Sequence, residues 1–291
     1  MSRATVEAAS AEQVSELAAF VPSRYRERLR RGELAPELRL VGAWADDEPI
    51  GAGLAHISEE WANCESLYVL AGRRRDGIGR ELLRALEHEC RLAGATTMTA
   101  VLPDDDRFLA IRRLLGTDGW AAPRLQHRQF ETDERIRASA PLNEPHDLSA
   151  YRITAFSELD ERDRAALRRI ARAIPAGLDP LRSEDRVVPE ASLLLRRDGE
   201  VVGWAVNEYF APGTTLVATV WIAPSERGGG LGGLLGLLAM RAALDAGYER
   251  IRFVVDADNA AMIRIVERVV VPYGATEVGL LETTRSLRVG P

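Results

Sequence analysis

An internal repeat constrains the fold of this chain more than any other feature of its sequence. Val69, Arg74 and Gly77 recur 153 positions later as Ile222, Arg227 and Gly230, and the offset holds without a gap from residue 69 to residue 101. Further upstream the register changes by one, so that Gly51 aligns with Gly203. A strand, a turn, a helix and a second strand therefore agree in length, which predicts two copies of one domain.

Each half reads as a short strand, an amphipathic helix, a hairpin of strands, a glycine turn, a helix, a strand, a helix and a final strand. The predicted fold is mixed α/β (α+β): two tandem domains, each a mixed, mostly antiparallel twisted sheet flanked by helices. We predict helices over 11–21 and 162–174, the second stopped by Pro175. The predicted boundaries are an N-terminal domain over 1–135, a polar linker over 136–149 and a C-terminal domain over 150–291.

Composition excludes several classes of protein. The 291 residues are 46% hydrophobic and 28% charged, as expected of a globular chain, and no apolar run approaches the roughly 20 residues that span a bilayer. The start of the chain lacks the layout of a signal peptide, and Cys64 and Cys90 are the two cysteines, so we expect a cytoplasmic protein. All 38 basic residues are arginines, which excludes a Walker A loop and Schiff-base chemistry. The net charge of −6 gives no reason to expect a nucleic-acid partner.

The glycine turn is the strongest chemical signal. In the C-terminal half, a strand ending near Ala223 is followed by Pro224, by Arg227 and by a run of glycines from which a leucine-rich helix begins. Glycines let backbone N–H groups converge, and the helix N-terminus adds unpaired N–H groups and partial positive charge. With an arginine beside it, such a turn is suited to a phosphate or diphosphate group.

Other interpretations of the same residues are weaker. A glycine turn can serve only to join a strand to a helix, but two copies with the same arginine spacing disfavour that. Gly228, Gly230 and Gly233 fit a dinucleotide fingerprint, yet residues 224–227 separate them from the strand, and the N-terminal copy lacks the pattern. The four histidines lack metal-ligand spacing, so no metal site is predicted, and no nucleophile elbow is present.

Both turns, Arg74-Arg75-Asp76-Gly77-Ile78-Gly79 and Arg227-Gly228-Gly229-Gly230-Leu231-Gly232, resemble motif A of the GNAT superfamily of N-acetyltransferases. The two copies make the chain similar in layout to tandem GNAT proteins, the class that includes mycothiol synthase. The resemblance implies that acetyl-CoA binds with its pyrophosphate on the turn amides and its pantetheine arm along the preceding strand. The implied cofactor-binding residues are Trp221, Ile222, Ala223, Arg227, Gly228, Gly229, Gly230, Leu231, Gly232, Gly233, Asn259 and Met262, together with Val69, Arg74, Arg75, Gly77, Ile78, Gly79 and Arg80.

The family's catalytic positions are filled unevenly. Glu65 stands where family members often keep a general base, whereas its C-terminal counterpart is Ala218, and Glu208 is a substitute by proximity alone. The position of the family's acid is Val266, which leaves Tyr273 as a replacement, with Tyr209 as a second one. We therefore expect the C-terminal half to carry the chemistry and the N-terminal half to be partly degenerate, forming a wall of the acceptor cleft.

The predicted function is transfer of an acetyl group from acetyl-CoA to a primary amine of a small molecule or peptide. The alternative is a non-catalytic tandem GNAT protein that binds acyl-CoA or a protein partner. The expected partners are acetyl-CoA and an amine acceptor, with no nucleic acid and no membrane, in a monomer or homodimer.

Overall fold

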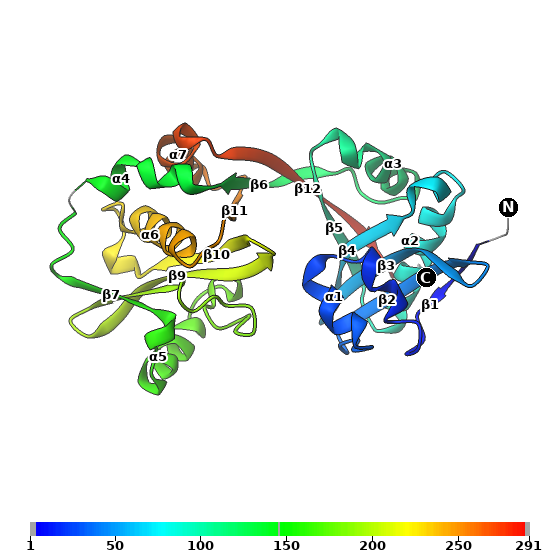
Figure 1. Ribbon diagram of the computed structural model, residues 1–291, viewed down its shortest axis with the longest axis horizontal. Coiled ribbons are helices and arrows are strands. Elements are labelled where there is room, and N and C mark those ends of the chain that lie inside the picture. The colour runs from blue at the N-terminus through cyan, green and yellow to red at the C-terminus, as the bar shows by residue number, and fades with distance from the viewer. Residues whose placement is uncertain (1–3, 145, 289–291) are drawn as a thin grey trace. The chain divides into compact units, whose positions relative to one another are not determined.

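The computed structural model describes residues 4–144 and 146–288, which form two compact units (Figure 1). Pro145, in the predicted linker, lies outside the described residues. The first unit contains the described residues up to Gln126 together with those from Gly279 onward, and the second unit is His127–Val278. Each unit combines one mixed sheet with helices on its faces, which confirms the predicted fold class.

The first unit holds a sheet in which β4 and β5 run parallel and every other pairing is antiparallel, in the order β1, β2, β3, β4, β5, β12. Its helices α1 and α2 pack on separate apolar clusters, one around Leu17 and Leu54 and one around Leu82 and Met98. The elements are β1 (Thr5–Ala8), α1 (Ser23–Arg30), β2 (Leu38–Ala45), β3 (Glu48–Ser58), β4 (Trp61–Val69), α2 (Ile78–Leu92), β5 (Thr97–Pro103), α3 (Leu109–Thr117) and β12 (Thr276–Ser286).

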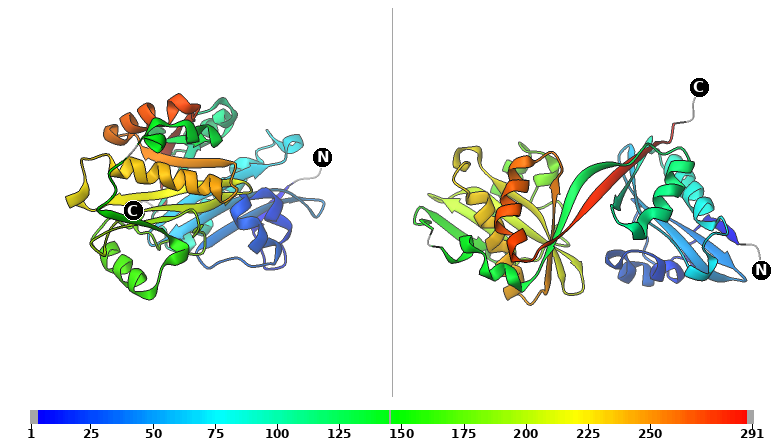
Figure 2. Two further views of the ribbon diagram at one scale, coloured as in Figure 1. Left: turned by 60° about the vertical axis from the view of Figure 1, so that its left-hand side comes forward. Right: turned by 90° about the horizontal axis from the view of Figure 1, so that it is seen from above.

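The second unit repeats this order as β7, β8, β9, β10, β11, β6, and again the pairing of β10 with β11 is parallel. Helices α6 and α5 cover opposite faces of the sheet (Figures 1 and 2). The elements are β6 (Arg124–Thr132), α4 (Ala140–Asn143), β7 (Tyr151–Ala155), α5 (Glu161–Ala171), β8 (Leu193–Arg197), β9 (Glu200–Ala211), β10 (Thr214–Ile222), α6 (Leu231–Asp245), β11 (Arg250–Asp256) and α7 (Ala260–Val269).

The last strand of each sequence half pairs with the next-to-last strand of the other half. Strand β12, from the C-terminal half, pairs with β5 over Leu280–Ser286, and β6, from the N-terminal half, pairs with β11. The compact units therefore divide the chain differently from the boundaries drawn along the sequence. Residues 127–149 belong to the second unit, and the described residues beyond 278 belong to the first.

The segment predicted as a linker packs on the second unit. Ile136 is fully buried in the core that also contains Phe253 and Val266. The Ser139 hydroxyl donates a hydrogen bond to the carbonyl of Val269 at 2.9 Å, and the short helix α4 follows. The buried side chain of Ile136 and the hydrogen bond of Ser139 thus hold this mostly polar segment on the second unit.

The helix predicted over 11–21 differs in the structure. Its apolar positions Val14, Leu17 and Val21 are buried as expected, but the regular part is a short 3₁₀ helix, Glu16–Phe20, and an α-helix begins only at Ser23. The reason is Pro22, because a residue that precedes proline is driven into extended backbone, and Val21 has φ −112° and ψ 164°. The helix predicted over 162–174 is α5, which ends at Ala171, before Pro175.

Among the described residues, no helix combines the length and the apolar character that crossing a bilayer requires.

Gly51 and Gly203 hold the same place in the two sheets, opposite Val69 and Ile222, where two strands approach closely. A Cβ built at Gly203 would lie 2.7 Å from Cδ1 of Ile222 and 2.9 Å from the Trp221 carbonyl oxygen. These glycines therefore let the strand before the turn lie tightly against its hairpin partner.

We expect Gly203→Ala to lower the free energy of unfolding by about 1–3 kcal/mol, because the added methyl group forces the backbone of β9 away from β10. Urea denaturation followed by circular dichroism measures the change. Gly177→Ala is the matched control, since a Cβ at Gly177 meets no heavy atom within 4 Å. Equal stability of the Gly203 variant and the unmodified protein would contradict this account of the close approach.

Candidate functional site

The two parallel strands of the second unit separate before they end. Parallel pairing joins Thr214–Val217 to Arg250–Phe253, although β10 continues to Ile222 and β11 to Asp256. The first unit repeats the arrangement, because pairing of β4 with β5 covers only Trp61–Cys64. Each unit therefore presents unpaired strand edges inside its sheet, which an extended ligand can use for main-chain hydrogen bonds.

A β-bulge marks the point where each pair opens. The register between β10 and β9 shifts between Val217 and Thr219, which leaves Ala218 as the extra residue. In β4 the corresponding shift leaves Glu65 as the extra residue. Bulges re-aim side chains and often lie beside active sites, so the predicted base position coincides with a defined break in the sheet.

The glycine turn connects the open end of β10 to α6. Gly228 has φ +102° and Gly230 has φ +77°, a left-handed conformation that favours glycine. Arg227 bends back so that its Nε donates a hydrogen bond to the Ile222 carbonyl at 3.0 Å. In the first unit Arg74 makes the same bond to the Val69 carbonyl, also at 3.0 Å. The arginine spacing read from the sequence thus corresponds to a structural bond that holds strand and turn together in both copies.

The turn amides of the second unit are accessible. Among the described residues, no side chain caps the N-terminus of α6, and a Cβ built at Gly228, Gly229 or Gly230 would meet no heavy atom within 4 Å. The first turn of α6 contains no acidic residue. Free N–H groups and the positive end of the helix dipole therefore face open space, as a diphosphate site requires.

The turn of the first unit carries different groups around its helix start. Arg75 occupies the left-handed position that Gly228 fills in the second unit, with φ +80°. Glu81 adds a negative charge in the first turn of α2, and Arg80 is paired with Asp118 at 3.1 Å. The two turns thus differ in backbone residue and in the charges beside the helix start.

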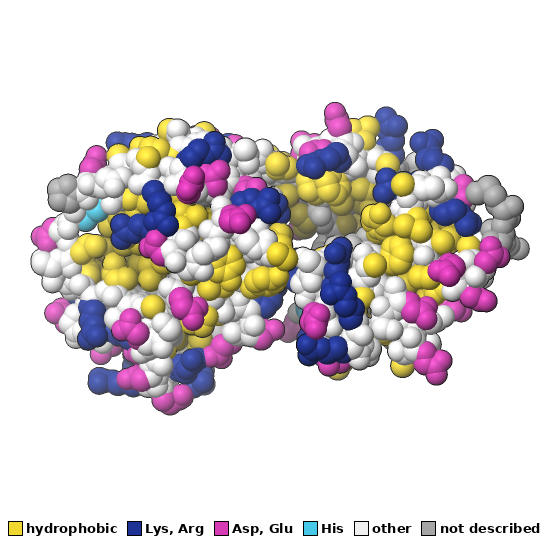
Figure 3. Space-filling view, viewed as in Figure 1, with side chains coloured by type: hydrophobic (Ala, Val, Ile, Leu, Met, Phe, Trp, Pro, Cys, Tyr) yellow, Lys and Arg dark blue, Asp and Glu magenta, His cyan; other side chains and the backbone are white. Residues whose placement is uncertain are grey.

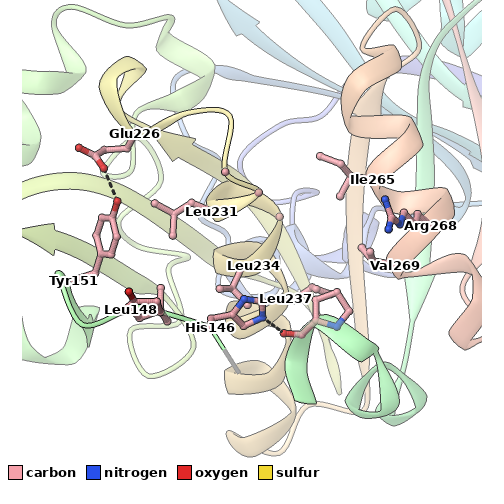
Figure 4. Close-up of a pocket in the computed structure, with 15 residues that line it drawn as sticks. His146, Leu148, Tyr151, Glu226, Leu231, Leu234, Leu237, Ile265, Arg268 and Val269 are labelled. Atoms are coloured by element: carbon pink, nitrogen blue, oxygen red, sulfur yellow. Dashed lines mark hydrogen bonds between the residues drawn. The ribbon is translucent and has the colours of Figure 1, made fainter. Parts of the chain in front are cut away.

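A pocket of about 510 Å³ opens beside the C-terminal turn (Figure 4). Leu231, Leu234 and Leu237 of α6 form one side, and Ile265, Arg268 and Val269 of α7 form another (Figure 4). The space-filling view shows hydrophobic side chains gathered in a hollow over α6 (Figure 3). The remaining lining comes from the turn and from the segment before β7: Pro141, His146, Asp147, Leu148, Tyr151, Glu226, Gly229, Gly230 and Gly233.

Glu226 brings a negative charge to this pocket, and two neighbours compensate it. The Tyr151 hydroxyl donates a hydrogen bond to its carboxylate at 2.5 Å, and Arg197 lies 3.1 Å away. This hydrogen bond raises the pKa of Tyr151 and lowers the pKa of Glu226. The carboxylate is therefore held as the anion but neutralised by Arg197, beside the turn proposed to bind phosphate.

The predicted catalytic residues each have a partner in the structure. Glu65 accepts hydrogen bonds from Arg24 and, at 2.8 Å, from Asn63. Glu208 lies opposite Leu216 in the paired part of β10, and its carboxylate is 3.1 Å from Arg186. The Tyr273 hydroxyl accepts a hydrogen bond from the backbone N–H of Ala140.

The structure also places three further residues that the sequence analysis named, Tyr209, Asn259 and Val266. Tyr209 is exposed near the end of β9. Asn259 caps α7, accepting a hydrogen bond from the N–H of Met262 at 3.1 Å. Val266, at the family's acid position, is buried in the core of the second unit. Tyr151, Arg197 and Arg268 were missed, because they come from segments without a recognisable motif.

In residues 4–144 and 146–288, no three His, Cys, Asp or Glu side chains gather in an arrangement that could hold a metal ion.

The titration of Tyr151 tests the geometry at the pocket. The hydrogen bond to Glu226 raises the pKa of Tyr151 in the folded protein. The bond therefore stabilises the fold fully at pH values below the pKa of Tyr151 in the unfolded chain, and this stabilisation is lost as the pH rises through the pKa in the folded protein. We expect Glu226→Gln to move the Tyr151 titration back toward the ordinary range. The ultraviolet difference spectrum between each protein and its Tyr151→Phe variant isolates this one residue among the six tyrosines. An unmoved titration would show that Tyr151 and Glu226 are not bonded in solution.

The chain is similar to known proteins both in sequence and in structure. The acetyltransferase (GNAT) family matches residues 6–112 and 154–269. The mycothiol acetyltransferase of Clavibacter sepedonicus is 26% identical over 268 residues, which cover 88% of this chain and 84% of that protein. That of Streptomyces avermitilis is 31% identical over 110 residues, 38% of this chain and 35% of that protein.

A tandem GNAT protein from the clavulanic acid biosynthesis pathway, solved without AcCoA, has a similar structure, with a TM-score of 0.75 and 17% identity. The match covers 99% of this chain and 100% of that one. The matched segments include both glycine turns, each of which follows a strand that has separated from its parallel neighbour. With two copies of the family's sequence and a fold to match, the chain belongs to the GNAT acetyltransferase family, in its tandem form.

Proposed function

We propose that the second unit binds acetyl-CoA and transfers its acetyl group to a primary amine of a small molecule or peptide. The observation that carries the proposal is the continuous path from the open edge of β10, through an uncapped glycine turn, to the pocket between α6 and α7. The main-chain groups of the strand edge match the pantetheine arm of the cofactor. The free amides of the turn match its diphosphate, and the apolar surface of the pocket matches its adenosine end.

The residues present fit this cofactor. The amides around Gly230 would hold the diphosphate, and the unpaired edge of β10 near Trp221 and Ile222 would pair with the pantetheine arm. The leucines of α6 and Ile265 of α7 supply apolar surface, and Arg268 supplies a positive charge. When bound, acetyl-CoA supplies an activated thioester.

The protein's own contribution to the rate would be mainly positioning. Ala218 and Val266 have no acid or base function, so the second unit lacks both groups at the positions where the family often keeps them. Holding an amine and a thioester within reacting distance can by itself supply a large part of a rate enhancement. Glu208, Tyr273 and Glu65 stay candidates for moving a proton.

The same observation favours a second candidate, a tandem GNAT protein that binds acyl-CoA without turning it over. Thiol release from acetyl-CoA over a panel of primary amines separates the two. Release that depends on one amine supports the transferase, and tight binding with no release on any amine of the panel favours the binder.

The relatives direct the choice of amines. Two of them are named mycothiol acetyltransferases, so the panel should begin with small-molecule primary amines that also carry a thiol.

We expect Arg227→Ala to weaken binding of CoA by about 1–3 kcal/mol, because it removes a charged group beside the diphosphate and loosens the turn. Calorimetric titration with CoA measures the loss. Arg74→Ala is the matched control, since Arg74 makes the equivalent bond to its own strand in the first unit. Unchanged affinity in the Arg227 variant, or an equal loss in both, would contradict the assignment of the cofactor to the second unit.

The compensated charge at Glu226 gives a further prediction. Arg197→Ala leaves the carboxylate without its guanidinium beside the anion site, so we expect weaker CoA binding. In the double variant with Glu226→Gln, affinity should return toward that of the unmodified protein. If the double variant instead binds CoA as weakly as the sum of the two single changes in binding free energy predicts, Arg197 does not act on CoA by neutralising Glu226.

A further inference from the structure

Two of the buried hydroxyls without a hydrogen-bond partner occupy equivalent places in the two halves of the sequence. Among the described residues, Thr219 Oγ1 and Ser66 Oγ both lack one, and Thr219 is only 7% exposed. The two residues are 153 positions apart, so they occupy the same place in the repeat. Each directly follows the bulge residue of its strand, Ala218 or Glu65.

An unpaired buried hydroxyl is unfavourable, since folding removes its water and returns no hydrogen bond. Valine has nearly the same outline as threonine and would avoid the penalty. Groups that break the rule of satisfied buried polar atoms concentrate at functional sites, where a ligand completes the bonding. Thr215 Oγ1 and Thr132 Oγ1 lack partners among the described residues as well, so it is the place of Thr219 beside the opening between β10 and β11 that indicates a ligand.

The position of Thr219 indicates which part of a ligand it meets. It lies two residues beyond Val217, the last residue of β10 paired with β11, and hence at the inner end of the opening. Thr219 pairs with Val206, whose side chain packs with Trp204 and Trp221 on the face opposite α6. From Thr219 to Ala223, where the turn begins, the strand spans about 13 Å. A ligand held by its diphosphate at the turn and extended back along β10 would bring its far end to the part of the strand that contains Thr219.

We propose that the Thr219 hydroxyl donates a hydrogen bond to the carbonyl oxygen of the acyl group carried on CoA. The inference rests on the proposed function and adds a residue that recognises the acyl group. The hydroxyl keeps its proton, and no bond to Thr219 forms or breaks. Because free CoA ends in a thiol and lacks the thioester carbonyl of the acyl group, Thr219 distinguishes the acylated donor from the product, favouring binding of the first and release of the second.

The chain offers a matched control on the same strand. Thr215 Oγ1 is also buried and unpartnered among the described residues, and Thr215 is fully buried. It differs in one respect, because Thr215 is paired on both sides, with Tyr209 of β9 and Ile251 of β11. A hydroxyl there has the same chemistry but lies outside the opening.

The test is a comparison of two affinities. Calorimetric titrations with acetyl-CoA and with CoA are made on the unmodified protein and on Thr219→Val, Thr219→Ser and Thr215→Val. We expect the unmodified protein to prefer acetyl-CoA. Thr219→Val should reduce that preference about threefold to tenfold, the range for one neutral hydrogen bond, with CoA affinity unchanged. Thr219→Ser should retain the preference, and Thr215→Val should leave both affinities as they are.

Stability provides a readout that checks folding separately. Both valine variants remove an unpaired buried hydroxyl, so their urea midpoints should equal or exceed that of the unmodified protein. Equal affinities for acetyl-CoA and CoA in the unmodified protein, or a preference that Thr219→Val retains, would overturn the role of Thr219 while leaving the cofactor site in place. Failure of the unmodified protein to bind either compound would instead overturn the proposed function.

Discussion

The junction between β10 and α6 sets the geometry on which the site depends. A strand that has left its parallel neighbour must pass into a helix within a few residues, and left-handed backbone at Gly228 and Gly230 makes that turn possible. Arg227 fixes the junction through its bond to the Ile222 carbonyl. In the part of the chain that the structure describes, two sets of main-chain groups have no protein partner: the edge of β10 beyond Val217 and the first amides of α6.

The two copies of the junction share a framework but differ in chemistry. Arg74 holds the first turn as Arg227 holds the second, and each strand pair opens at a bulge. In the first unit, Glu81 and the Arg80–Asp118 pair surround the helix start with charges that partly cancel, and Glu65 is paired with Arg24. In the second unit the helix start has no acidic residue, and the pocket lies beside it. The repeat thus preserves the backbone geometry of the junction, and the side chains around it differ between the two copies.

The sequence predicted the parts of the structure that depend on local chemistry. The spacing of Arg227 and Gly230 located the turn, and the length agreement of the two halves predicted the repeated sheet. It could not predict the exchange of β6 and β12, because strand pairing between distant segments leaves no local signal. Pro22 was the missed signal behind the misplaced first helix. Tyr151 and Arg197 reach Glu226 only because β7 and β8 pair in the folded sheet. The bulge at Ala218, directly before Thr219, leaves no signal in the sequence, where the segment resembles an ordinary strand.

The central claim is that main-chain amides at the start of α6, and not those at the start of α2, bind the diphosphate of CoA. A crystal structure of the protein grown with CoA tests it most directly. We expect diphosphate oxygens within hydrogen-bond distance of the backbone nitrogens around Gly230, with the pantetheine arm along β10. A diphosphate bound at the turn around Gly77 alone, or at neither turn, would contradict it.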